Sequence, residues 1–346
     1  MSENKKILFL ECTGNDRAIN YLYDGFVSKI GRENVIEFPE ILAYVPEDVD
    51  EVPNHKHNGR CFNYRDEFFN EIDGGRRNWT RENILNMAKN EEFEAVFCGT
   101  EIDINHYMDI IQQIPQVGYL DWSEHGIDPI SISKKLDCLN RRCFYFKREM
   151  IATTKRSVGL SEVYPFPFCV IPRQNTKIRN NYKIDKKYDI YFRGLWTDDI
   201  RNKICSQSEH ILNESGEYKI GFFKSWEDFK SRNDMLRDIS DSYLGMSMRG
   251  AGMDTFRFWE VLSTETCLIS QNTGLLIPND YIDMKEIVYF KDIKELKEKF
   301  LYLMGHKNEI EEIAKNGSIK TMQYHTTEKR AEYVSRIMGL QCLERR

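Results

Sequence analysis

The sequence predicts an α/β protein made of two doubly wound domains, each built on a parallel sheet. Short apolar runs alternate with helix-patterned segments along the whole chain, which is typical of βαβ units. A length of 346 residues suits two domains better than one. Residues 164–187 contain three prolines and then a polar, basic run, which predicts a linker between two series of strands.

Each half of the chain contains five apolar runs that we expect to be strands. In the first half these are residues 7–10, 35–38, 95–98, 117–120 and 143–146, and in the second half 188–192, 218–222, 243–248, 267–270 and 287–290. From residue 291 onward the pattern is helical, with Leu296, Phe300, Ile310, Ile313 and Ile319 as core candidates. Residues 40–78 are too many for a plain loop and predict a lid, a binding loop or an insertion.

These runs divide the chain into three parts. We expect a Rossmann-like N-terminal domain over residues 1–165 and a Rossmann-like C-terminal domain over 166–325. Residues 326–346 are expected to form a C-terminal helix that packs back on the first domain. Ligands of open α/β sheets bind at the carboxyl edges of the strands, so the cleft between the two domains is the expected site.

Composition excludes some classes of partner. The formal net charge of −6 argues against a nucleic-acid-binding surface, which needs clustered Lys and Arg. Nine cysteines occur without a CxxC pair or metal-ligand spacing, which indicates buried free thiols in a reducing compartment. The N-terminal apolar stretch is too short for a signal or a membrane span. We therefore expect a cytoplasmic protein.

The stretch "RGAGMDTFRFWE" carries an unusual set of charges at the end of the expected strand 243–248. Its small-residue turn precedes a helix expected over residues 255–262 with Asp254 as cap, and such a helix start offers free N–H groups to a phosphate. Arg257 and Glu260 share a face of that helix. They form either a surface ion pair beside core aromatics, or a site in which Arg257 binds a diphosphate and Glu260 a ribose.

A similar turn opens the second domain. Arg193 and Gly194 stand where strand 188–192 meets a helix, and Arg193 is either a second diphosphate ligand or a solvated loop arginine. The donor-binding candidates are Arg193, Gly194, Arg249, Gly250, Gly252, Asp254, Thr255, Arg257 and Glu260.

The first half contributes candidates for proton transfer. Asp121, Glu124 and His125 follow strand 117–120, so that three titratable groups share one loop, and one of them is expected to be a general base. The alternative is a polar loop with a capping acid and a surface histidine. The loop after the first strand faces the same cleft and supplies the acceptor-side candidates Gly14, Asn15 and Asp16, of which Asp16 is the reserve base.

Two absences in the motifs bear on cofactors. The G-x-G-x-x-G spacing is missing after the first strand, so a dinucleotide cofactor is not expected. The "DVD" of residues 48–50 lies in an acidic loop rather than after a strand, so no obligatory metal is expected either.

The stretch "GAGMDTFRFWEVLSTETCLIS" resembles the C-terminal signature of GT-B glycosyltransferases of the exostosin-like and spore-maturation-protein-like type. The likeness continues in "GLLIPNDYIDMKEIVYF" and "HTTEKRAEYVSRIM", and it extends from about residue 164 to the C-terminus. It implies that Glu260 matches the glutamate that binds the donor ribose, and that Arg257 and Asp254 match charged positions of the same run. The acid that an E-x7-E pair needs at position 252 is replaced by Gly252, so a retaining reaction is not implied.

The resemblance implies a GT-B glycosyltransferase that moves a sugar from a UDP- or GDP-sugar to an acceptor hydroxyl without a metal. The acceptor would be a glycan, a protein or a small molecule. The alternative is a non-catalytic nucleotide-sugar or glycan-binding module of the same fold. A DNA-modifying glycosyltransferase is disfavoured by the acidic charge.

Overall fold

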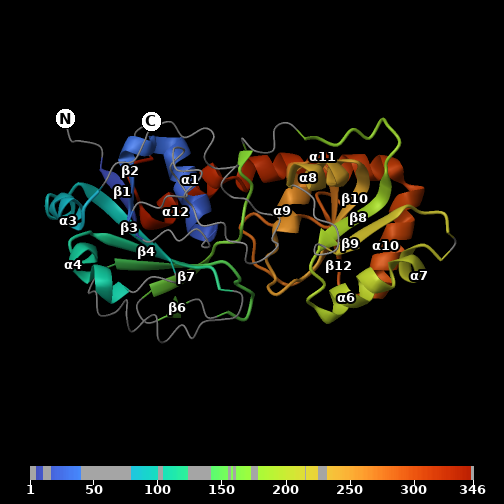
Figure 1. Cartoon of the computed structure of the whole chain (residues 1–346), viewed down its shortest axis with the longest axis horizontal. Coiled ribbons are helices and arrows are strands. Elements are labelled where there is room, and N and C mark those ends of the chain that lie inside the picture. Colours follow the sequence, from blue (N-terminus) through green and yellow to red (C-terminus); the bar gives the residue numbers. More distant parts are fainter. Residues whose placement is uncertain are drawn as a thin grey trace.

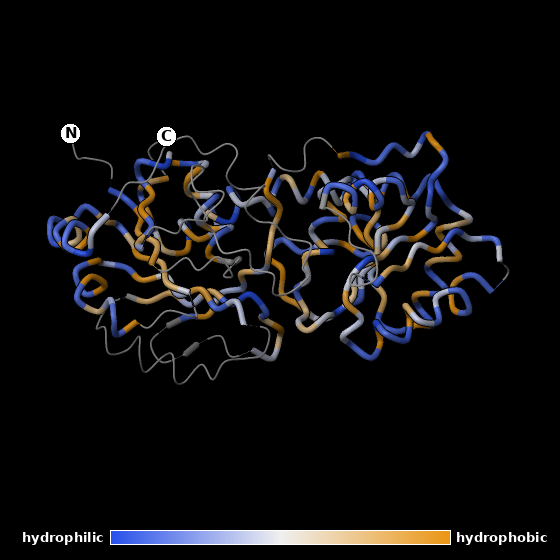
Figure 2. Tube along the Cα trace, in the orientation of Figure 1, coloured by the Kyte–Doolittle hydropathy of each residue, from blue (hydrophilic) through white to orange (hydrophobic). Residues whose placement is uncertain are grey.

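The computed structural model of the chain describes residues 5–10, 17–39, 79–99, 104–123, 142–154, 157–158, 161–172, 178–214, 216–224 and 232–343. Two sheets with helices on their faces lie side by side along the long axis of the molecule (Figure 1). Apolar residues concentrate in the strands and on the helix faces turned toward them (Figure 2). The predicted class, two doubly wound α/β domains, is confirmed.

The N-terminal sheet has the strand order β2-β1-β3-β4-β5-β7-β6, and all its pairs are parallel except β6 with β7. All five expected strands are present. The strands are β1 (Lys6–Leu10), β2 (Val35–Phe38), β3 (Phe93–Gly99), β4 (Gln116–Asp121), β5 (Arg142–Lys147), β6 (Ser157–Val158) and β7 (Ser161–Pro165). The helices are α1 (Arg17–Ile30), α3 (Arg81–Lys89) and α4 (Met108–Ile111), with the 3-10 turns η1 (Arg32–Asn34) and η4 (Ile104–Tyr107).

The start of the expected linker was wrong, because Tyr164 and Pro165 belong to strand β7. The run "SEVYP" begins with two polar residues and ends in a proline, so it lacks the continuous hydrophobicity of the expected strands. Its pairing with β5, in which Tyr164 lies opposite Phe146, holds it in the sheet.

The C-terminal sheet is wholly parallel, with the order β12-β11-β10-β8-β9. The chain runs outward from β8 to β9 on one side and from β10 to β12 on the other, so the topological switch point lies between β8 and β10. The strands are β8 (Tyr188–Gly194), β9 (Ile220–Lys224), β10 (Ser242–Ser247), β11 (Cys267–Gln271) and β12 (Val288–Phe290). The helices are α6 (Asp199–Ser206), α7 (Ser208–Leu212), α8 (Arg232–Ser240), α9 (Phe256–Ser263), α10 (Ile293–Gly305) and α11 (Lys307–Tyr324).

Four of the five helical core candidates are buried: Leu296, Phe300, Ile310 and Ile313. Ile319 is 55% exposed, so its assignment to the core was wrong. On α11 the buried face runs through Ala314, Gly317 and Thr321, and Ile319 lies on the opposite side of the helix. Small residues such as Gly317, Ser318 and Thr321 fill part of the buried face, so hydrophobicity alone did not mark it.

Two segments join the domains. Residues 166–171 cross toward the C-terminal domain, and α12 (Thr327–Met338) returns to lie beside α1 (Figure 1). The two segments are bonded to each other, because Val170 pairs with Thr326 and the Arg330 guanidinium donates to the carbonyls of Pro167 (3.1 Å) and Phe168 (3.0 Å). The division at residues 165 and 325 stays a prediction.

Candidate active site

The switch point between β8 and β10 is lined by arginines. Arg193, at the end of β8, is only 1% exposed, so the alternative of a solvated loop arginine was wrong. Its Nε donates to the Tyr191 hydroxyl (3.1 Å), and its guanidinium lies over the Phe223 ring, 4.7 Å from the centroid. Its backbone carbonyl accepts from Arg257 Nη2 (2.6 Å) and Nε (3.2 Å). The two arginines that the sequence placed in separate turns therefore meet.

The Arg257 and Glu260 side chains form an ion pair, with 2.8 Å between Nη1 and Oε2. The two side chains are 11% and 6% exposed, so the pair is buried rather than superficial. Their helix, α9, follows β10. The pair faces the end of β8 because Arg257 donates to the Arg193 carbonyl there. A buried ion pair is costly to desolvate and seldom adds stability, which makes a role beyond stability the more natural explanation for it.

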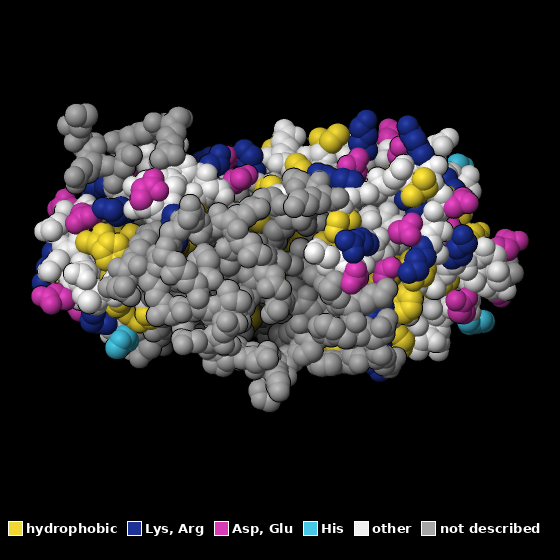
Figure 3. Space-filling view, turned by 45° about the horizontal axis from the view of Figure 1, so that its top comes forward, with side chains coloured by type: hydrophobic (Ala, Val, Ile, Leu, Met, Phe, Trp, Pro, Cys, Tyr) yellow, Lys and Arg dark blue, Asp and Glu magenta, His cyan; other side chains and the backbone are white. Residues whose placement is uncertain are grey.

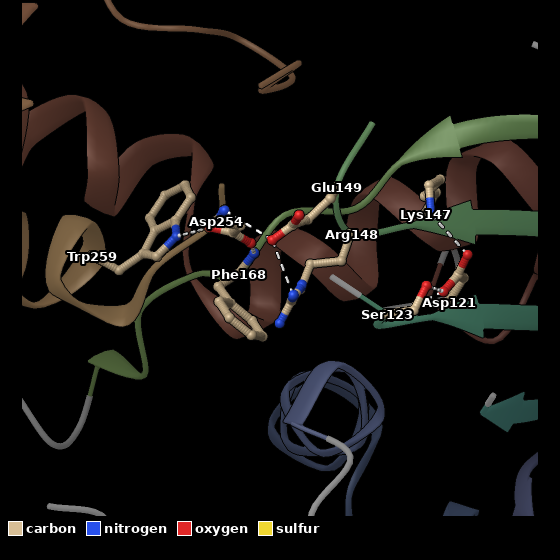
Figure 4. Close-up of polar contacts among 8 residues, drawn as sticks. All are labelled: Asp121, Ser123, Lys147, Arg148, Glu149, Phe168, Asp254 and Trp259. Atoms are coloured by element: carbon tan, nitrogen blue, oxygen red, sulfur yellow. Dashed lines mark hydrogen bonds and ion pairs between the residues drawn. The ribbon is translucent and has the colours of Figure 1, made fainter. Parts of the chain in front are cut away.

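Asp254 does not cap α9, contrary to expectation. The N-cap is Thr255, whose side chain makes no capping bond, and its hydroxyl lies 2.9 Å from the Ser247 hydroxyl. The Asp254 carboxylate instead accepts from the Phe168 N–H (2.6 Å) and from Trp259 Nε1 (2.9 Å), as Figure 4 shows. The helix begins one residue later than expected, so Asp254 precedes the N-cap and its carboxylate bonds the crossing segment instead of the first N–H groups of the helix.

The surroundings of Asp254 link the two domains. Its backbone N–H donates to Glu149 Oε1 (3.1 Å), which also accepts from Arg148 Nη2 (3.0 Å), and both residues follow β5 (Figure 4). Burial raises the pKa of Asp254 to about 6, against the opposing effects of the Arg148 charge and of the two hydrogen bonds to the carboxylate. The donor-side turn is thus fastened to the N-terminal domain.

A residue that the sequence analysis did not select lies beneath this turn. Arg201, on the first turn of α6, donates from Nη1 to the Leu195 carbonyl (2.8 Å) and from Nη2 to the Met248 carbonyl. A Cβ on Gly250 would lie 3.1 Å from both of these nitrogens. The spacing of Arg201 from the apolar Ile204 and Cys205 put it on the buried face of α6, and that was the available signal.

A cavity of about 220 Å³ opens at the ends of β10 and β11. Its wall brings together three of the donor candidates, Arg249, Asp254 and Thr255. Arg249 N–H donates to the Gln271 side chain (3.0 Å), and Leu276 N–H donates to Met150 of the N-terminal domain (2.7 Å). The rest of the polar lining includes Ser247, Ser270, Asn272, Thr273, Asp280 and Tyr289. The cavity thus opens at the turn after β10, and two of its lining residues, Asp254 and Leu276, are hydrogen-bonded to residues of the N-terminal domain.

The remaining donor candidates are glycines. Gly250 N–H donates to the Gly252 carbonyl (2.9 Å), which closes the turn after β10. Gly194 ends β8, where a Cβ would lie 2.9 Å from the Phe192 ring. Both turns therefore run close to buried side chains, and a larger residue would have to displace them.

Asp121, at the end of β4, lies in a closed network. It is buried, and its carboxylate accepts from Lys147 Nζ (2.9 Å) and from the Ser123 N–H (2.9 Å), the two partners drawn in Figure 4. It also accepts from the Tyr145 hydroxyl. Burial raises its pKa, but the Lys147 charge and these hydrogen bonds outweigh burial, so the pKa is lowered. A carboxylate held in this way is a weak base.

The other candidates of the first half lie outside the described residues. These are Glu124, His125, Gly14, Asn15, Asp16 and the acidic loop of residues 48–50. Their roles stay predictions.

Comparisons with known proteins point to one fold. Residues 220–336 match a family model described as glycosyl transferase-like. A glycosyltransferase from Rickettsia africae is 10% identical, with a TM-score of 0.55 over 99% of this chain and 100% of that one. The fold is GT-B. No curated protein matches the chain.

Two further solved structures share this GT-B fold. HepE from Anabaena, solved with UDP and glucose, is 10% identical, with a TM-score of 0.53 over 97% of this chain and 99% of that one. Sucrose-phosphate synthase from Thermosynechococcus elongatus is 9% identical, with a TM-score of 0.54 over 96% and 98% of the two chains. The exostosin-like or spore-maturation-like subtype stays a prediction.

Two more observations concern possible contacts with other molecules and with membranes. On the face of the C-terminal domain shown in Figure 3, basic and acidic side chains are interspersed. Over the described part of the chain, no helix combines the length and apolar character needed to span a bilayer.

Proposed function

We propose that the protein is a glycosyltransferase that takes a sugar from a UDP- or GDP-sugar to an acceptor hydroxyl. The observation that carries the proposal is the group of arginines at the switch point of a GT-B fold, where the family match begins on the adjacent strand β9. HepE, which shares the fold, was solved with UDP and glucose. Open α/β sheets bind nucleotides at this point, and guanidinium groups suit a diphosphate.

Each part of the proposed site has one task. Arg193, Arg257 and the turn from Gly250 to Asp254 would stabilise the negative charge that develops on the leaving diphosphate. Glu260 would bind the donor ribose. The cavity of about 220 Å³ at the ends of β10 and β11 would take the sugar of the donor.

The identity of the base is a proposal that rests on the chemistry of Asp121. Asp121 has a lowered pKa and a carboxylate already bonded to three side chains, which favours a positioning role for it. We therefore propose Glu124 or His125, on the same loop, as the group that takes the acceptor proton, with Asp16 in reserve. No metal is part of the proposal, because arginines would neutralise the leaving group.

The proposal extends to the compartment. In the described part of the chain, six cysteines are free thiols, four of them buried. Buried free thiols suit a reducing environment, which supports a cytoplasmic location.

The second candidate is a module that binds nucleotide sugars without turnover. It is favoured by Gly252, which stands buried where retaining relatives of the E-x7-E type carry an acid. The two candidates differ in whether the nucleotide diphosphate is released.

The test is a panel of UDP- and GDP-sugars scored in two ways. Thermal stabilisation reports binding, because a ligand of the folded state raises stability by RT ln(1 + [L]/Kd), and chromatography reports free UDP or GDP after prolonged incubation. Binding with release supports the transferase, and binding without release supports the module. Failure of every nucleotide sugar to stabilise the protein would overturn both.

A matched pair of variants assigns the result to the site. Arg257→Gln should lose most of the stabilisation, whereas Arg237→Gln, which removes a 69% exposed arginine of α8, should not. Release should continue in EDTA. Loss of release in EDTA with recovery on adding Mn²⁺ would contradict metal independence.

A further inference from the structure

Arg201 is a buried cation without an acidic partner. It is 6% exposed, and among the described residues no carboxylate lies within ion-pair distance of its guanidinium. The neighbouring Asp198 caps α6, accepting from the N–H groups of Ile200 (3.0 Å) and Arg201 (3.4 Å). The Arg201 Nε has no hydrogen-bond acceptor in the described structure. Burying such a charge is costly unless something compensates it, and here the Phe192 ring, 5.2 Å from the guanidinium carbon to the centroid, does so only in part.

The position of this charge is specific. Its two Nη atoms bond the carbonyls of Leu195, after β8, and Met248, after β10, which are the two loops that flank the switch point. A Cβ added to Gly250 would lie 3.1 Å from both Nη atoms of Arg201, so the turn after β10 packs directly against the guanidinium. Burial lowers its pKa to about 10, with the charge of Arg257 acting in the same direction, so the group is still charged at neutral pH.

We propose that Arg201 is a positioning residue for the donor diphosphate. It holds both loops at the switch point by their carbonyls, and it places a positive charge behind them that a bound diphosphate would compensate. This inference rests on the proposed function and adds the residue that sets the shape and charge of its phosphate site. An arginine with a purely structural role would support every ligand of the site equally, whereas this one should favour diphosphates over nucleosides.

The experiment compares ligands that differ only in the diphosphate. Binding of UDP, uridine, GDP and guanosine is measured by calorimetry for the parent, Arg201→Gln, Arg201→Lys and the control Lys203→Gln, which removes an exposed charge from the same helix. In Arg201→Gln we expect the preference for the nucleoside diphosphate over its nucleoside to fall by about tenfold or more, with nucleoside affinity kept. In Arg201→Lys the preference should be intermediate, because lysine keeps the charge but cannot bond the Leu195 and Met248 carbonyls at the same time with a planar guanidinium.

Each outcome decides something. An unchanged preference in both Arg201 variants, or equal weakening of nucleoside and diphosphate, would overturn the positioning role. If Arg201→Gln does not fold, as judged by its melting curve, Arg201→Lys alone decides by the same ratio. A parent that binds neither UDP nor GDP would refute the proposed function itself, which separates that failure from a failure of Arg201.

Discussion

Replacing Glu260 by glutamine tests the donor site at its most defined contact. The residue is 5% exposed, and its Oε2 accepts from Arg257 Nη1 at 2.8 Å. Glutamine keeps the size and one acceptor and removes the charge. A buried hydrogen bond to a charged group is worth about 1.5–3 kcal/mol, so donor affinity should fall about 10- to 150-fold.

The assay separates two reasons for that loss. If Glu260 binds the ribose, the parent prefers UDP to 2′-deoxy-UDP in calorimetry, and Glu260→Gln loses this preference in a double-mutant cycle. If Glu260 only holds Arg257, both nucleotides weaken by the same factor. If the parent prefers GDP, GDP and 2′-deoxy-GDP are compared instead.

Glu298→Gln is the matched control, since Glu298 is 63% exposed on α10 and should leave both affinities unchanged. Equal Kd values for UDP in the parent and in Glu260→Gln would refute the assignment of Glu260 to the donor site.

Three further predictions follow from the structure. In Gly25→Ala the new Cβ would lie 2.1 Å from the Thr327 carbonyl oxygen, so we expect the free energy of unfolding to fall by about 1–3 kcal/mol in calorimetric or denaturant measurements. The control Gly305→Ala, with open space around the new Cβ, should be neutral. Equal stabilities of the two variants would contradict the clash. The pKa of Asp254 is raised from 3.8 to about 6, so its contribution to the free energy of unfolding is present below about pH 4 and is lost as pH rises through 6. Denaturant curves from pH 4 to 7 should show this loss in the parent and not in Asp254→Asn. The same pH dependence in both proteins would disprove it. Removing the base, Glu124→Gln or His125→Asn, should lower kcat by roughly 10²- to 10⁴-fold with donor affinity kept, and normal kcat in both variants would move the base to another residue.

The fold was predictable because the strands are strongly apolar and evenly separated by helical patterns. All ten expected strands are present. Gly245 in β10 pairs with Tyr191 in β8, so the turns that follow these two strands lie side by side at the switch point. The turn residues themselves were visible, because a glycine after an apolar strand marks the carboxyl edge. What the sequence could not supply is which charged groups are buried together.

Three cases show the reason. Arg193 looked like a loop residue, yet pairing in the sheet and the Phe223 ring bury it. Asp254 has the residue type of a helix cap, but α9 begins one residue later than expected, and the Asp254 carboxylate accepts from the Phe168 N–H of the crossing segment. Arg201 was given no role because its acceptors, the Leu195 and Met248 carbonyls, are backbone atoms of distant loops, and the sequence indicates only that it lies on the buried face of α6.

The return of α12 to the N-terminal domain has a consequence for the order of events during synthesis. The face of α1 around Asp24 and Gly25 is covered by Thr327 and Ala331, which follow the entire C-terminal sheet in the chain. A ribosome must therefore make both domains before the first one can complete its helix layer. Until then the apolar residues of α1 that α12 covers stay exposed, and exposed apolar surface of this kind is prone to aggregation.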